Sequence, residues 1–195
     1  MTKIVHGQQA RWQDARSWAE GALARARAPQ SRQDLLGIYL NDHLAGATGG
    51  MELARRMAGS HHDPAQRMTL QRLAADITQD RRALLDIMAT LDLPVRYYKL
   101  SAAWAAEKAA RLKLNGRLLS RSPLSSLEEL EMLRLGVEGK AAGWRTLRTL
   151  ADTDSRLNRD RLDELMARAR QQADLLEELR VQAAAHLIEA EPDTA

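Results

Sequence analysis

Residues 39–56 read Tyr39-Leu-Asn-Asp-His-Leu-Ala-Gly-Ala-Thr-Gly-Gly-Met-Glu-Leu-Ala-Arg-Arg56, and this stretch decides the fold class. Alternating steps of four and three residues give the inward stripe of a bundle helix: Leu36, Leu40, His43, Ala47, Gly50, Ala54 and Met57. A glycine inside a helix costs about 1 kcal/mol relative to alanine. A stable helix containing Gly46, Gly49 and Gly50 therefore predicts close approach by neighbouring helices, at the centre of a bundle.

The composition predicts one soluble, all-α domain. The chain has 195 residues, of which 45% are hydrophobic, and it has no phenylalanine, which favours helix over strand. Cysteine is absent, and this excludes disulfides and thiolate chemistry. The N-terminus has no run that resembles a signal peptide, and no stretch reaches the ~20 apolar residues of a membrane span. We expect a cytoplasmic protein that does not enter a membrane.

Periodicity and capping signals predict six helices, at about residues 8–28, 31–58, 63–91, 94–115, 125–152 and 157–189. Ser31 with Asp34, Asp63 before Pro64, and Ser125 or Ser126 are the expected helix starts. Short linkers favour antiparallel neighbours, so the simplest topology is an up-down bundle of the middle four helices. In this arrangement residues 1–30 form an accessory helix, 31–190 the helical bundle with the last helix flanking it, and 191–195 a disordered tail.

Several segments together resemble a group of small bacterial proteins with a ferritin-like bundle: Tyr39-Leu-Asn-Asp-His-Leu-Ala-Gly46, Ile77 with Asp80, Trp104 with Glu107-Lys108, Arg121-Ser-Pro-Leu-Ser125, and Glu129-Leu-Glu131 with Gly136-Val-Glu-Gly-Lys140 and Trp144. The resemblance covers roughly residues 31–190 and implies a ferritin-like four-helix core. Active ferritin-like proteins carry Glu-x-x-His on each of two helices as iron ligands. No Glu-x-x-His occurs in this chain, so the resemblance implies a fold and little about activity.

One polar residue lies near the middle of four successive predicted stripes: His43, Asp80, Glu107 and Lys140. The stripe with Glu107 is one of two that the sequence permits for residues 94–115; the other contains Tyr98, Ala102, Ala105, Ala109 and Leu112. Burying an unpaired charge costs several kcal/mol, so those residues that are inside must pair with one another or with water.

Two interpretations of these four residues remain. In the first, His43, Asp80 and Glu107 are ligands of a metal, or line a small-molecule site in the bundle centre. In the second, the four form a polar network in which the Lys140 ammonium takes the place of a metal cation. A site with only three candidate ligands and a neighbouring lysine does not match the ligand sets that divalent metals prefer. This favours the second interpretation, a polar network at a vestigial metal site. We therefore expect no cofactor, with iron or manganese as the alternative.

The net charge of +3 is too small to indicate a nucleic-acid partner by itself. Residues 96–121 are basic and include Tyr97, Tyr98 and Trp104, a composition that nucleic-acid-binding surfaces also have. Charge complementarity with the acidic helix at 125–152 explains these cations more simply, so nucleic acid is not the expected partner.

Apolar surface on the first and last helices favours a homodimer over the competing monomer. The first helix offers Trp12, Ala15 and Ala19, and the last offers a longer stripe: Leu162, Leu165, Ala169, Gln172, Leu176, Leu179 and Ala183. The sequence thus indicates a non-catalytic, metal-free bundle acting as an oligomeric or partner-binding scaffold. The alternative is a divergent iron- or manganese-binding ferritin-like protein or oxidase.

Overall fold

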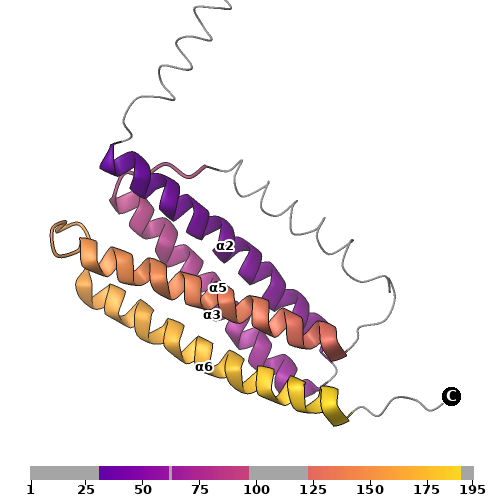
Figure 1. Ribbon diagram of the computed structural model, residues 1–195. Helices are drawn as coiled ribbons and strands as arrows, with labels where there is room; N and C mark the ends of the chain where they lie inside the picture. The colour runs from indigo at the N-terminus through magenta and orange to yellow at the C-terminus, as the bar shows by residue number, and fades with distance from the viewer. Residues whose placement is uncertain (1–30, 62, 97–122, 190–195) are drawn as a thin grey trace, which may run out of the picture. The chain divides into compact units, whose positions relative to one another are not determined.

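The computed structural model describes residues 31–61, 63–96 and 123–189, and the chain divides into two units, Met1–Leu35 and Leu36–Ala195. In these ranges the regular elements are four helices, with no strand: α2 (Arg32–Ser60), α3 (Pro64–Thr90), α5 (Pro123–Leu150) and α6 (Arg159–Glu189) (Figure 1). The all-α prediction is confirmed for this part of the chain. Residues 94–96 are not helical. The rest of the helix predicted at 94–115, the helix predicted at 8–28 and the tail at 191–195 lie outside the described residues.

Side chains cap α2 and α3 where the sequence predicted them. The Asp34 backbone N–H donates to Ser31 Oγ at 3.1 Å, and the Ser31 N–H donates back to Asp34 Oδ2 at 3.1 Å, which makes a capping box. Asp63 Oδ1 accepts from the Ala65 N–H at 2.9 Å, with Pro64 in the first turn of α3. α5 begins earlier than predicted, at Pro123, because proline has no N–H to satisfy and suits a first turn.

The core consists of two apolar clusters, one in each half of the bundle. One cluster joins the C-terminal half of α2 to the N-terminal halves of α3 and α5 and the C-terminal half of α6: Leu53, Ala54, Met57, Ala58, Leu70, Leu73, Ala74, Ile77, Leu130, Leu133, Val137, Leu176 and Leu179. The other joins the opposite halves and includes Leu40, Leu44, Leu84, Met88, Trp144, Leu147, Leu162 and Leu165. Leu40, Ala54 and Met57 of the inward stripe predicted for α2 lie in these clusters.

These clusters also fix the helix directions. α2 and α6 run one way, whereas α3 and α5 both run the other way (Figure 1). These directions agree with the predicted up-down order, in which a helix between α3 and α5 runs back along the bundle. Because that helix lies outside the described residues, the up-down order stays a prediction. The prediction that the last helix flanks the bundle is wrong. Its Leu162, Leu165 and Leu176 are at most 1% exposed and belong to the core.

Asn41 joins α2 to the chain that follows α3, and sequence reasoning did not single it out. Its side chain is 1% exposed. Nδ2 donates to the Gly37 carbonyl at 2.7 Å and to the Pro94 carbonyl at 3.0 Å, and Oδ1 accepts from the Arg96 N–H at 2.7 Å. Every hydrogen-bonding group of this buried amide is therefore used, and residues 94–96 are held against α2.

We predict that Asn41→Ala lowers the free energy of unfolding by about 1–3 kcal/mol, because it leaves the Pro94 carbonyl and the Arg96 N–H without their partner. The control Gln71→Ala changes an exposed residue of α3 and should stay within about 0.5 kcal/mol of the wild type. Urea denaturation followed by circular dichroism measures both. Equal, small effects would show that Asn41 contributes nothing specific.

Candidate functional site

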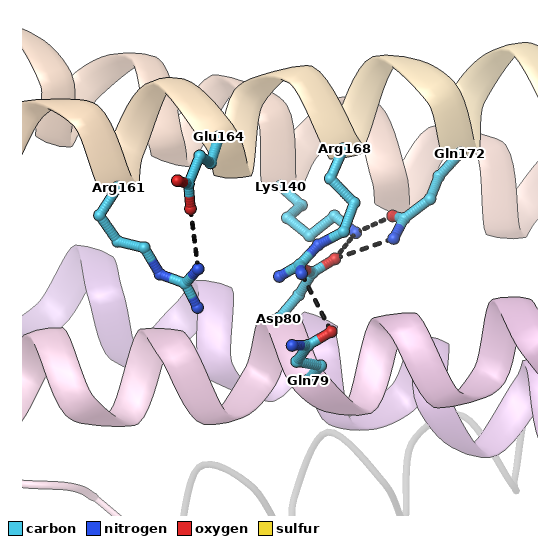
Figure 2. Close-up of polar contacts among 7 residues, drawn as sticks. All are labelled: Gln79, Asp80, Lys140, Arg161, Glu164, Arg168 and Gln172. Atoms are coloured by element: carbon cyan, nitrogen blue, oxygen red, sulfur yellow. Dashed lines mark hydrogen bonds and ion pairs between the residues drawn. The ribbon is translucent and has the colours of Figure 1, made fainter.

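A polar cluster around Asp80 separates the two apolar clusters of the core. Asp80 is 1% exposed and lies between Ile77 and Leu84 on the inward face of α3. Its carboxylate accepts from Lys140 Nζ of α5 at 2.6 Å, from Arg168 Nε of α6 at 2.7 Å and from Gln172 Nε2 of α6 at 3.1 Å (Figure 2). Three helices therefore meet on one buried carboxylate.

The donors to Asp80 are themselves tied together. Lys140 Nζ also donates to Gln172 Oε1, and Arg168 Nη1 donates to Gln79 Oε1 at 3.0 Å (Figure 2). The Lys140 and Arg168 side chains are 12% and 22% exposed, so both cations are largely removed from water. Burial lowers the pKa of the Lys140 ammonium, and the Asp80 carboxylate opposes this shift. The ion pairs therefore offset part of the free-energy cost of burying these charges inside the bundle.

A cavity of about 360 Å³ lies at the same level, between α2, α3 and α5. Its walls are mostly apolar and include Leu40, Ile77, Leu84, Val137, Trp144 and Leu147. Gly46 and Gly50 of α2 and Gly136, Gly139 and Gly143 of α5 also line it. Its polar lining residues are Tyr39, Asp42, His43, Asp80 and Lys140. The Trp144 indole N–H is buried without a hydrogen-bond partner.

His43 packs against the cavity wall through its ring. The Tyr39 ring meets the imidazole edge-on, with centroids 4.5 Å apart. A Cβ placed on Gly143 would lie 3.2 Å from His43 Cε1, so glycine at this position makes room for the histidine. Burial lowers the pKa of His43, and the Asp42 carboxylate opposes this shift. The folded chain thus favours the neutral imidazole of His43 more than the unfolded chain does.

The described residues make no close contact at Gly46 and Gly50 of α2. Among these residues, a Cβ on Gly46 would meet no atom within 4 Å, and one on Gly50 would make only an ordinary contact of 3.8 Å with Leu133 Cδ1. The close approach expected at the glycines of α2 is therefore not made by the described helices and stays a prediction. Gly143 of α5 is the tight position instead.

Three of the four predicted site residues come together. His43, Asp80 and Lys140 line one cavity, and Asp80 and Lys140 form an ion pair. No hydrogen bond joins His43 to either of them. Glu107 lies outside the described residues. Sequence reasoning missed Arg168, although the residue is four positions before Gln172, which belongs to the stripe of the last helix.

The described residues do not fit a metal site of the kind that ferritin-like enzymes hold. No group of three or more histidine and carboxylate side chains comes together within the described ranges. Both oxygens of Asp80 already accept hydrogen bonds from cationic or amide groups. An ammonium beside the carboxylate would repel a divalent cation, because like charges in a buried site disfavour each other.

Comparisons of the chain with protein-family models, with curated proteins and with solved structures find no match. The ferritin-like resemblance therefore stays a prediction. Among the helices that the structure describes, none has an apolar stretch long enough to cross a membrane.

We predict that Lys140→Met lowers the free energy of unfolding by about 3 kcal/mol, the lower end for a broken buried ion pair, because Arg168 and Gln172 still serve Asp80. Adding Asp80→Asn to Lys140→Met should cost less than the sum of the single changes. Arg55→Met, which breaks an exposed pair with Glu52, is the control and should cost under about 1 kcal/mol. Additive losses in the double variant would contradict the coupling.

We predict that His43 makes the fold sensitive to acid. Its pKa is lowered from 6.5 in the folded chain, so below this pH the unfolded chain binds more protons and stability falls as pH falls. Between about pH 7.5 and about pH 5.5, His43→Gln should lose less stability than the wild type, because glutamine does not titrate. Urea midpoints at the two pH values measure the difference, and identical pH dependence in both proteins would refute it.

Proposed function

We propose that this chain is a non-catalytic, metal-free helical bundle of the ferritin-like kind that works as an oligomeric or partner-binding scaffold. The observation that carries the proposal is the Lys140 ammonium on the Asp80 carboxylate, 2.6 Å away, at the level where the apolar core is interrupted. In a metal-binding bundle, inward carboxylates at this level would need a cation. Here a side chain of the protein supplies the positive charge.

The order of the helices also supports a ferritin-like relationship. Ferritin-like bundles differ from simple up-down bundles by one long crossover connection. α3 and α5 are parallel, as the two helices on either side of such a crossover are. This argument concerns topology alone, and the metal-free part of the proposal rests on the pairing of Lys140 with Asp80.

A divergent iron or manganese protein is the alternative, with His43, Asp80 and Glu107 as its ligands. The first two line one cavity, which is the observation in its favour. The engagement of Asp80 by Lys140 and Arg168 weighs against it.

We predict that protein purified without chelator contains no stoichiometric iron or manganese, and elemental analysis of the purified chain measures this. The His43→Ala variant is the control, because a specific site that uses this imidazole would lose its metal on the change. Stoichiometric metal in the wild type that disappears in His43→Ala would replace the scaffold by the metal-binding alternative.

We propose a homodimer as the working form, and a cytoplasmic location belongs to the same proposal. Since α6 buries its stripe in its own core, the dimer now depends on the predicted helix at 8–28, which lies outside the described residues. Light scattering should give twice the 21.8 kDa of one chain, and a variant lacking residues 1–28 should give the monomer mass. A monomer mass for the full chain at every concentration would refute the dimer.

A further inference from the structure

The cavity between α2 and α5 belongs to a longer apolar strip on α5. Met132, Gly136, Gly139 and Gly143 follow one another in steps of four, three and four, and so lie on one face of α5. Met132 is 63% exposed, and its neighbour Leu135 is 64% exposed. We call this strip, with Gly46 and Gly50 of α2 opposite, the glycine groove.

The described helices do not explain why the groove is built from glycine. A Cβ on Gly46, Gly136 or Gly139 would meet no atom of the described residues within 4 Å. Each glycine nevertheless costs about 1 kcal/mol relative to alanine in a helix interior. Glycine suits a surface that another backbone approaches closely. The groove therefore has the properties of a surface that receives a further helix.

The chain itself has to pass along the bundle between the ends of this groove. Arg96 is tied to Asn41 in the N-terminal half of α2. Pro123 begins α5 at the other end, where Glu129 pairs with Arg56 of α2 at 3.1 Å. The 26 residues between Arg96 and Pro123 would reach roughly 39 Å as a helix, which suffices to run beside α2 from Asn41 to Arg56, roughly 23 Å.

The sequence of this connection complements the groove in charge. Residues 97–122 contain one acid, Glu107, and six cations: Lys99, Lys108, Arg111, Lys113, Arg117 and Arg121. Exposed carboxylates stand on the two groove helices, at Asp42 on α2 and at Glu128 and Glu138 on α5. Opposite charges on facing surfaces favour one orientation of the partners over others.

We propose that the glycine groove is the docking surface for residues 97–122 of the same chain. The apolar positions of that connection fill the cavity between the glycines, and its cations face the carboxylates of α2 and α5. The proposal does not depend on the proposed function, since it concerns how the chain covers its own core.

Disulfide trapping in the full chain tests this directly, because the chain has no cysteine of its own. Gly139→Cys is combined with cysteine at each of residues 102–110, one pair at a time, and the pairs are oxidised under mild conditions. A disulfide needs Cα atoms within about 7 Å of each other. We expect intramolecular disulfides at positions three or four apart, as one face of a helix would give.

The matched series places the first cysteine at Ala167, an exposed residue of α6, in place of Gly139. Trapping should be lost in this series. Circular dichroism of each reduced variant selects those that keep the native fold. Disulfides between two chains would overturn the proposal in favour of a second copy. Equal trapping in the two series, or none in the Gly139 series, would overturn it and leave the groove open to a small apolar ligand.

Discussion

The burial of one carboxylate, that of Asp80, constrains the rest of the bundle. A charge removed from water has to be paired and hydrogen-bonded, or it costs several kcal/mol. Lys140, Arg168 and Gln172 meet this need from two other helices. If α5 or α6 moved along its axis by one turn, the carboxylate would lose donors that no neighbouring apolar side chain could replace. The polar cluster thus fixes the relative heights of α3, α5 and α6.

Periodicity alone was enough to predict part of the core and part of the polar cluster. Leu40, Ala54 and Met57 of the stripe predicted for α2 are buried, and Asp80 and Lys140, two of the four polar residues predicted near the middle of their helices, form an ion pair. Side-chain periodicity reports which residues share a face, and charges on inward faces must find each other. The contribution of Arg168 was not predictable in the same way, because a long arginine can reach inward from a partly exposed position.

The topology was predictable in part. Short linkers suggest antiparallel neighbours, and α2 and α3 are antiparallel as the up-down order requires, but the sequence marks a break at Pro94 without showing where the chain goes next. Asn41 supplies the missing information, since its amide holds Pro94 and Arg96 beside the N-terminal half of α2. A single buried amide in an otherwise apolar face carries no sequence signature that distinguishes this role.

The division of the core into two apolar clusters has a consequence for how the bundle moves. Each cluster excludes water on its own, at opposite ends of the four helices, and the polar cluster between them contributes mainly specificity of arrangement. Proteins open locally in contiguous units whose boundaries follow the density of apolar contact. The end of the bundle with the α2–α3 turn and the end with the α5–α6 turn are therefore expected to open locally as two separate units. Hydrogen exchange in one end would proceed while the other end stays closed around its own leucines.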